Sequence, residues 1–464
     1  MTAVSLDLID LPFGWDDVNA FLDRAVDLNR TGTGAGFADV TADVTGLGLA
    51  PGTPVVIALP NGRPLLEHWF AVLLTGGVPL TVSPATSSAR IAELSARTGA
   101  GAVIALRPDP ARYGAADSLP VGDARAVLLP TDGPRHPAGS VLMLTSGTSG
   151  LFSACLHRAD SLVRNARRHA EAVGLRPDDT VFVNLPLFYS YAIVAQALAA
   201  LLVGARLVIS GPPFSPATYP GLLDEHGITS SSVTPTIARL LLRRGEKLPS
   251  GLRMLTVGGD QLPAEQVAGL LRAVPDTELY VTYGLTEAGP RVATLAAHRE
   301  PEHRFGSVGL PLPGVGVELR DVRDGVGELL VRTDTALVAK LGGNGDRALA
   351  TPGLVATGDR FRIDEDGYLY FDGRLSDFLV VKGEKVSLSA VRRLALAQPG
   401  VVGCTTRVGT EPDGSPHYEL DIRLDEDAAG QAERIRRSVL SFLLPGERPR
   451  TVSIGAADPA ALQK

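Results

Sequence analysis

Short apolar runs alternate with longer amphipathic stretches between about residues 50 and 285. Val55–Leu59 is typical of a buried strand, and the apolar residues from Leu65 to Leu74 recur at helical spacing. Strands that alternate with helices of this length favour doubly wound, largely parallel sheets, which bind ligands at the carboxyl ends of their strands. The further elements predicted are strands Val78–Val82, Thr180–Leu185, Ala205–Ile209, Ile228–Val233, Leu252–Val257 and Glu278–Thr282, and helices from Ala192, near Thr218, at Pro235–Leu242 and at Pro263–Val274.

The pattern changes after about Gly306, where short alternating segments with many glycines predict a small β-barrel or antiparallel unit as far as Phe371. We therefore expect an α/β fold whose large N-terminal domain, residues 1–372, combines doubly wound, mostly parallel sheets with this small barrel. A small, mobile α+β C-terminal domain, residues 373–464, follows. Its predicted elements are helices Leu388–Ala397 and Ala432–Leu443 and strands Val401–Val408 and Tyr418–Leu424.

Composition excludes several classes of function. The 464 residues are 45% hydrophobic and 20% charged, and the net charge of −7 offers no general attraction for nucleic acid. The first residues are acidic and lack the apolar core of a signal peptide, and no run of about 20 apolar residues indicates a membrane span. The two cysteines, Cys155 and Cys404, form no disulfide framework. We expect a cytoplasmic protein with no nucleic-acid or membrane partner.

The segment Ser140–Arg158 contains the first candidate site. An apolar strand leads into TSGTSG at 145–150, whose glycines permit close backbone approach and whose N–H and hydroxyl groups suit an anion. The same residues also suit an ordinary turn. No G-x-x-x-x-G-K-[ST] pattern is present, so the loop is not of the Walker type. Lysine is scarce, and its five positions are Lys247, Lys340, Lys382, Lys385 and Lys464.

Three further motifs follow this loop. Tyr283–Glu287 (YGLTE) comes directly after an apolar strand and combines an aromatic ring, a hydroxyl and a carboxylate. Thr357–Asp359 places a carboxylate after a tight turn, and the segment from Gly373 to Ser387 brings an arginine and two lysines to the expected domain joint. Each motif alone has an ordinary interpretation as core, turn or surface. Their order and separation argue against coincidence.

Together these motifs resemble the adenylate-forming superfamily of acyl- and aryl-CoA ligases, peptide-synthetase adenylation domains and luciferases. The resemblance runs from Val55 to at least Ser387 and includes PLFYSYA at 186–192, Gly258–Leu262 and GSVGLPLPG at 306–314. It implies that a small-molecule carboxylate attacks the α-phosphate of ATP, with Mg²⁺ present, and releases pyrophosphate. A thiol of CoA or of a carrier protein would then take the acyl group.

The resemblance also assigns roles to residues. Asp359 would hold the ribose hydroxyls, Tyr283 would stack near adenine, and Thr286 would contact the α-phosphate. Glu287 would be the metal ligand that helps to hold Mg²⁺, and Arg374 would contact the ribose or the phosphates. The implied catalytic set is Thr286, Glu287, Arg374 and Lys464, and the implied nucleotide-binding set is Thr145, Ser146, Gly147, Thr148, Ser149, Gly150, Gly258, Gly259, Asp260, Tyr283, Gly284, Asp359 and Arg374.

Two lysines of the family pattern are displaced or missing. Ser153 stands where the phosphate loop normally has a lysine, so a full positive charge is lost beside the triphosphate. His157 and Arg158 are the candidates for partial compensation. The catalytic lysine near the C-terminus corresponds roughly to Lys464, which is the last residue and lacks the preceding glycine. Whether Lys464 takes this role stays open.

Phe188, Tyr189 and Tyr191, together with Gly284, form the expected substrate pocket. Amino-acid-activating relatives carry an aspartate at the position of Tyr189 that pairs with the substrate ammonium, and a tyrosine lacks that charge. We therefore expect an aryl or other planar acid rather than an α-amino acid. The alternative that two of the three aromatic residues belong to the core remains open.

Two other functions are compatible with the altered loop. Some relatives activate nitrite and diazotise an aromatic amine, and the loss of two lysine functions would suit such a specialised branch. A degenerate, non-catalytic nucleotide-binding protein is the second alternative. The presence of Thr286, Glu287, Asp359 and Arg374 argues against it, because binding alone has less need of the carboxylate associated with Mg²⁺.

Overall fold

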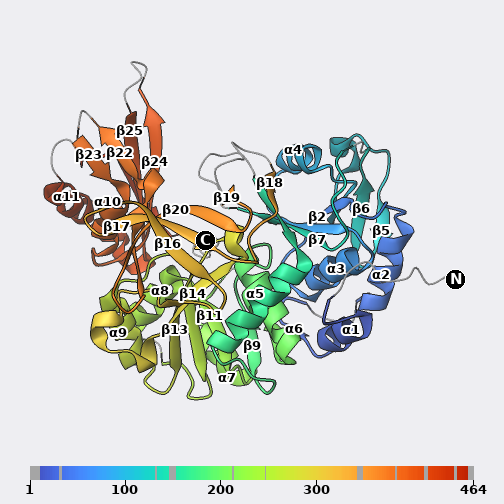
Figure 1. The fold of residues 1–464 in the computed structure, drawn as a ribbon, viewed down its shortest axis with the longest axis horizontal. Coiled ribbons are helices and arrows are strands. Elements are labelled where there is room, and N and C mark those ends of the chain that lie inside the picture. The colour runs from blue at the N-terminus through green and yellow to red at the C-terminus, as the bar shows by residue number, and fades with distance from the viewer. Residues whose placement is uncertain are drawn as a thin grey trace.

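The computed structural model places the elements in the expected order (Figure 1). It describes residues 11–30, 34–130, 133–145, 153–211, 214–245, 247–341, 349–381, 384–411, 416–443 and 447–457. The candidate residues Ser146, Gly147, Thr148, Ser149, Gly150 and Lys464 lie outside these described residues.

Two eight-stranded sheets form most of the N-terminal region. The first is parallel from β1 to β13, and its last two strands, β14 and β15, are antiparallel. Its central strands are short and buried along their length, as expected for parallel strands covered on both faces. In sheet order the strands are β1 (Val26–Asp27), β10 (Arg206–Ile209), β9 (Thr180–Val183), β11 (Ser230–Val233), β12 (Met254–Gly258), β13 (Glu278–Gly284), β14 (Arg291–Ala296) and β15 (Leu310–Pro311).

The second sheet has a parallel centre and antiparallel edges. One edge strand, β18, comes from far along the chain and pairs with β8, the strand that follows the TSGTSG loop. In sheet order the strands are β18 (Ala339–Leu341), β8 (Ala154–Arg158), β7 (Ser140–Leu144), β3 (Val78–Thr81), β2 (Pro54–Ala58), β4 (Ala102–Ala105), β6 (Ala124–Leu128) and β5 (Leu119–Val121).

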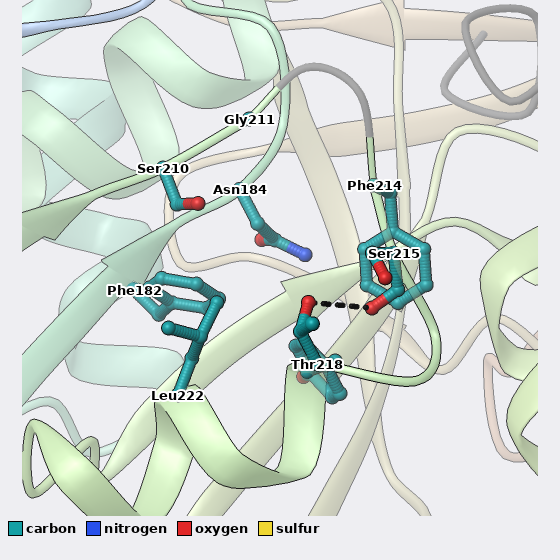
Figure 2. Close-up of a pocket in the computed structure, with 9 residues that line it drawn as sticks. Phe182, Asn184, Ser210, Gly211, Phe214, Ser215, Thr218 and Leu222 are labelled. Carbon is teal, nitrogen blue, oxygen red and sulfur yellow. Dashed lines mark hydrogen bonds between the residues drawn. The ribbon is translucent and has the colours of Figure 1, made fainter. Parts of the chain in front are cut away.

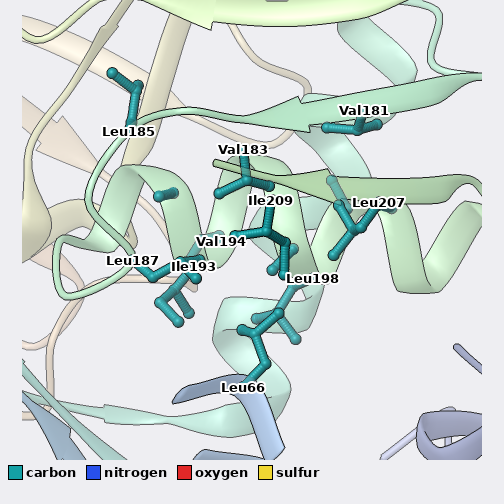
Figure 3. Close-up of a cluster of buried hydrophobic side chains, with 14 of the residues drawn as sticks. Leu66, Val181, Val183, Leu185, Leu187, Ile193, Val194, Leu198, Leu207 and Ile209 are labelled. Atoms are coloured by element: carbon teal, nitrogen blue, oxygen red, sulfur yellow. The ribbon is translucent and has the colours of Figure 1, made fainter. Parts of the chain in front are cut away.

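Helices connect these strands and share a core with them. Figure 3 shows Leu66 of α3 beside Ile193, Val194 and Leu198, next to the apolar side chains of β9 and β10. The helix expected from Ala192 begins as a π-helix, η2, and continues as α6. The helices are α1 (Trp15–Asp23), α2 (Phe37–Gly46), α3 (Arg63–Leu74), α4 (Ser88–Thr98), α5 (Ala159–Ala172), η2 (Tyr191–Leu198), α6 (Ala199–Val203), α7 (Tyr219–Glu225), α8 (Pro235–Arg244) and α9 (Ala264–Ala273).

The region expected to be a small barrel is an antiparallel sheet of five strands. It has the order β16-β17-β20-β19, and β21 also pairs with β20. Because β20 carries Asp359 and β21 ends at Arg374, this pairing brings the last two sequence motifs together. The strands are β16 (Gly316–Arg323), β17 (Val326–Arg332), β19 (Leu349–Thr351), β20 (Leu354–Ile363) and β21 (Leu369–Arg374).

The C-terminal elements have a hydrophobic core of their own and adjoin α8 and α9 (Figure 1). Arg243 of α8 donates to the carbonyl of Val401, and Arg393 Nη1 donates to Gln261 Oε1 at 3.4 Å. This unit therefore contacts the segment that follows β12. Its elements are β22 (Phe378–Val381), β23 (Glu384–Ser387), α10 (Leu388–Leu396), β24 (Val401–Thr410), β25 (Pro416–Leu424), α11 (Ala432–Phe442) and β26 (Thr451–Ala456).

Candidate functional site

The carboxyl ends of β12 and β13 lie side by side, because Gly258 pairs with Thr282. A Cβ on Gly258 would lie 2.4 Å from Thr282 Oγ1, so a side chain there would displace the threonine. Gly259 has a φ of +100°, which favours glycine, and the space beside it is open. Asp260 is exposed, and its carboxylate accepts the Gln261 N–H at 2.8 Å. The segment therefore leaves its backbone accessible at Gly259, beside the end of β13.

Tyr283, Asp359 and Arg374 converge from three motifs. The Tyr283 hydroxyl donates to Asp359 Oδ2 at 2.7 Å, and Arg374 Nε lies 3.1 Å from Asp359 Oδ1. The Tyr283 ring packs edge-on against Phe361, with 4.8 Å between ring centroids. Asp359 is only 4% exposed. Tyr283, expected to lie near adenine, and Asp359, expected to bind the ribose, are therefore directly hydrogen-bonded to each other.

The electrostatics of this cluster balance burial against charge. Burial raises the pKa of Asp359, and the charge of Arg374 and the Tyr283 hydroxyl oppose that rise. For Arg374, burial lowers the pKa, but Asp359 outweighs burial and the pKa is raised overall. Burial, together with the Asp359 charge, raises the pKa of the Tyr283 hydroxyl well above its usual value. Tyr283 therefore stays a neutral hydrogen-bond donor.

Thr286 and Glu287 occupy a short 3₁₀ turn, η3 (Thr286–Ala288), directly after β13. The Thr286 hydroxyl lies 3.0 Å from the Ser190 hydroxyl, which joins the YGLTE motif to the PLFYSYA segment. Glu287 Oε1 accepts from Lys340 Nζ at 2.7 Å. Their side chains are 16% and 23% exposed respectively, so this ion pair is largely screened from water. Lys340 is thus the lysine that the described structure places beside the predicted metal ligand.

Thr145 and Ser153 frame the described ends of the TSGTSG loop. The Thr145 N–H donates to the Ser153 carbonyl at 3.0 Å, and the two hydroxyl oxygens are 2.6 Å apart. Ser153 precedes β8, in which Cys155 pairs with Lys340 of β18. Alternate residues of a strand share a face, so Ser153 and Cys155 lie on the same side. Lys340 therefore lies close to Ser153, the position where the family has a lysine.

His157 and Arg158 do not supply the missing charge. His157 is fully buried, and burial lowers its pKa to about 4 despite the nearby Glu287 carboxylate. The ring is therefore neutral near pH 7. Arg158 points to the surface, where its guanidinium makes hydrogen bonds of 2.9 and 3.1 Å to Asp160. The lysine nearest to this position among the described contacts, Lys340, lies on β18, a strand that the sequence pattern did not connect to this loop.

The predicted pocket residues form two groups. Phe188 and Tyr189 contact each other, with ring centroids 4.7 Å apart, and burial raises the pKa of Tyr189. Tyr191 instead lies beneath Arg291, whose Cζ is 4.5 Å from the Tyr191 ring centroid. Arg291 also adjoins Gly284, because a Cβ on Gly284 would lie 2.5 Å from Arg291 Nη2. The structure therefore places the Arg291 guanidinium beside two of the predicted pocket residues.

A separate small pocket lies near the ends of β9 and β10 (Figure 2). Figure 2 shows Asn184 directed into it, with Ser210 and Thr218 nearby. The Asn184 amide is buried and makes no hydrogen bond among the described residues. None of the predicted site residues lines this pocket.

The residues at the carboxyl ends of β12 and β13, together with Asp359, provide the chemical groups that a nucleotide site needs. Asp359 offers carboxylate oxygens for hydroxyl groups, Tyr283 offers an aromatic ring, and the open space beside Gly259 leaves room for close approach to the backbone. Lys340 and Arg291 are the two residues at this site that the motifs did not identify. The scarcity of lysine and the arginine four residues after YGLTE were the available signals.

Comparison with known proteins supports the same assignment. The model of the "AMP-binding enzyme" family matches residues 44–340, which is more than half of the chain. Pyochelin synthase PchD of Pseudomonas aeruginosa is 28% identical over 397 residues, covering 77% of this chain and 71% of PchD. The salicyl-AMP ligase / salicyl-S-ArCP synthetase of Mycobacterium tuberculosis is 27% identical over 398 residues, covering 78% of this chain and 70% of that protein.

A solved structure agrees over nearly the whole chain. The O-succinylbenzoate coenzyme A synthetase of Bacillus subtilis, in complex with ATP and magnesium ion, superposes with a TM-score of 0.73. The superposition covers 94% of this chain and 95% of that chain at 18% sequence identity, which shows a shared fold. The described residues contain no helix long and apolar enough to cross a membrane. By its family match, this chain belongs to the AMP-binding enzyme family and is an AMP-forming acid ligase.

Proposed function

We propose that this enzyme adenylates a small aryl carboxylic acid with ATP and then transfers the acyl group to a thiol of CoA or of a carrier protein. The observation that carries the proposal is the convergence of Tyr283, Asp359 and Arg374 beside the YGLTE turn. The salicyl-AMP ligase among the relatives supports an aryl acid. We assign the enzyme to the cytoplasm, with residues 373–464 as the mobile C-terminal domain.

The nucleotide would lie along the ends of β12 and β13. The Asp359 carboxylate, held in place by Tyr283 and Arg374, would accept hydrogen bonds from the ribose hydroxyls. The site for the base and the ribose would be lined by Gly258, Gly259, Asp260 and Gly284. Thr145, with the neighbouring loop residues Ser146, Gly147, Thr148, Ser149 and Gly150, would bind the phosphates. Burial of Asp359 strengthens these polar contacts because less water competes for them.

Glu287 would hold Mg²⁺ together with phosphate oxygens of ATP. A single carboxylate suits this ion, which usually keeps water and substrate phosphates as its other ligands. The described residues contain no group of three or more His, Cys, Asp or Glu side chains able to hold a metal by themselves. Bound there, the ion supplies neutralisation of phosphate charge as the carboxylate approaches.

Lys340 would supply a second positive charge at this point. In the structure it neutralises Glu287, and its pKa is raised because Glu287 outweighs the opposing effect of burial. With Glu287 engaged by Mg²⁺, the Lys340 ammonium would be available to the phosphates and would take the place of the lysine missing at Ser153. Thr286 contacts the α-phosphate, Arg374 stabilises developing charge from the side of the ribose, and Lys464 remains the candidate lysine of the C-terminal domain.

The direct test is acid-dependent ATP–pyrophosphate exchange. The panel contains benzoate, salicylate, anthranilate, nitrite and phenylalanine. We expect exchange with an aryl acid and none with phenylalanine, since Tyr189 stands where amino-acid-activating relatives carry the aspartate that pairs with the ammonium. ATP binding without exchange for any acid would contradict the proposal. Exchange with nitrite alone would favour a nitrite-activating enzyme instead.

A further inference from the structure

Arg291 is fixed in place by its own backbone. It begins β14, and its N–H donates to Asn165 Oδ1 of α5 at 2.9 Å. The Asn165 amide donates in return to the Arg291 carbonyl, also at 2.9 Å. These bonds hold the main chain of Arg291 and leave its guanidinium to other partners. The residue is 3% exposed.

The guanidinium lies between two predicted pocket residues. Its Cζ is 4.5 Å from the Tyr191 ring centroid, and Nη2 adjoins Gly284. Nη1 donates to Thr282 Oγ1 at 3.1 Å, whereas Nε is buried and has no hydrogen-bond partner among the described atoms. The Tyr191 hydroxyl continues the polar path to Thr256 at 3.0 Å. Arg291 therefore lies against two residues of the predicted pocket, and its Nε keeps unused hydrogen-bonding capacity.

The charge on Arg291 is not balanced by the described part of the protein. None of the described carboxylates makes an ion pair with it, and the named influences on its pKa are burial, which lowers it, and Tyr191, which raises it. An arginine remains protonated even when buried, because its pKa lies far above neutral pH. Nearby His169 carries no charge, since burial and Arg291 lower its pKa to about 3.

A buried cation without a counter-ion is costly, and such groups are normally paired. Arg291 is separated from Glu287 by three residues, and Glu287 already pairs with Lys340. The anion that would balance the charge of the Arg291 guanidinium is therefore expected to come from a bound ligand. The reacting carboxylate of the acid belongs near Thr286, so a different group of the same acid is the natural partner of Arg291.

We propose that Arg291 selects an acid with a second anionic group, a carboxylate or a sulfonate, at the end of the molecule remote from the reacting carboxylate. This inference rests on the proposed adenylation of an acid in the same pocket. A guanidinium binds such a group through two parallel N–H···O bonds, and its unpartnered Nε is a free donor for one of them. The Tyr191 ring beneath the guanidinium keeps water away from the pair.

The test compares matched acids in ATP–pyrophosphate exchange. Benzoate is measured against phthalate, isophthalate, terephthalate and 3-sulfobenzoate, with nitrite as the smallest anion. We expect the wild-type kcat/KM to be highest for one of the dianionic acids. Arg291→Met is expected to reduce that value by about 100-fold and to reduce kcat/KM for benzoate less, because truncating one partner of a buried charge pair leaves the other unpaired and benzoate has no second anionic group.

Arg291→Lys keeps the charge without the planar pair of donors and is expected to lie between Arg291→Met and wild type. Arg164→Met is the matched control, because Arg164 pairs with Asp160 and Asp334 at the surface. Equal kcat/KM for benzoate and every dianionic acid in the wild type would overturn the inference, whether or not the variants fold. Equal loss with all acids in folded Arg291→Met would also overturn it. Exchange with no acid at all would instead contradict the proposed function.

Discussion

Replacing Lys340 by methionine tests whether a strand-borne lysine has taken over the charge missing at Ser153. The Nζ–Oε1 distance to Glu287 is 2.7 Å, and both side chains are more than three-quarters buried. At an effective dielectric constant of about 20, a pair at this distance attracts by roughly 6 kcal/mol, before desolvation is subtracted. A comparable attraction to a phosphate oxygen, reduced by desolvation to roughly 2–3 kcal/mol, corresponds to about a 100-fold effect on rate.

We therefore expect Lys340→Met to lower kcat/KM for ATP in pyrophosphate exchange by about 100-fold. The Mg²⁺ concentration that gives half-maximal activity should fall, because Glu287 no longer pairs with a competing ammonium group. Magnesium titrations at fixed ATP measure this shift, which a purely structural role would not produce. Lys247→Met, at an exposed lysine, is the matched control and should leave both values unchanged.

Restoring a charge gives the second half of this test. Ser153→Lys in the Lys340→Met background should recover part of the lost rate, because Ser153 directly precedes β8, the strand that pairs with the strand of Lys340. Wild-type kcat/KM and an unchanged Mg²⁺ requirement in folded Lys340→Met would refute the reasoning. The ion pair with Glu287 would then be structural only.

Three other predictions follow from the same geometry. Asp359→Asn should raise KM for ATP at least tenfold, because one carboxylate oxygen paired with Arg374 is lost; an unchanged KM in exchange assays would contradict the ribose assignment. Gly284→Ala should abolish exchange, since its Cβ would lie 1.9 Å from the Pro290 carbonyl oxygen; full activity would show that the backbone moves freely there. The pKa of buried His157 is lowered from 6.5 to about 4, so the unfolded chain binds this proton first as pH falls. The free energy of unfolding from urea titrations should therefore drop between about pH 6.5 and 4, by up to roughly 3 kcal/mol from this group, and a flat profile would contradict its neutral burial.

The fold was largely predictable because its strands are short apolar runs between amphipathic helices. Pro54–Ala58 and Met254–Gly258 are buried at every position, and each coincides with an expected strand to within two residues. The π-helix at Tyr191–Leu198 was not predicted. Its apolar residues satisfy helical spacing in general, which does not distinguish a π-helix from an α-helix, and they join the same core as Leu66 and β9.

The site was predictable where motifs carry it and not where strand pairing creates it. Tyr283 and Asp359 were identified separately, and the structure joins them by one hydrogen bond. Lys340 depends on the pairing of β18 with β8, which links residues far apart in the chain. Arg291 depends on Asn165 of α5 for its position. Neither long-range contact leaves a periodic signal in the sequence.

The most direct test of the central claim follows oxygen from the acid into the nucleotide. An aryl acid that supports exchange is labelled with oxygen-18 in the reacting carboxylate and incubated with enzyme, ATP, Mg²⁺ and the acyl acceptor. If the carboxylate attacks the α-phosphate, mass spectrometry will find one labelled oxygen in the AMP released on acyl transfer, and the other products will include pyrophosphate. Unlabelled AMP, or ADP with inorganic phosphate, would show that the Tyr283–Asp359–Arg374 cluster does not support adenylation.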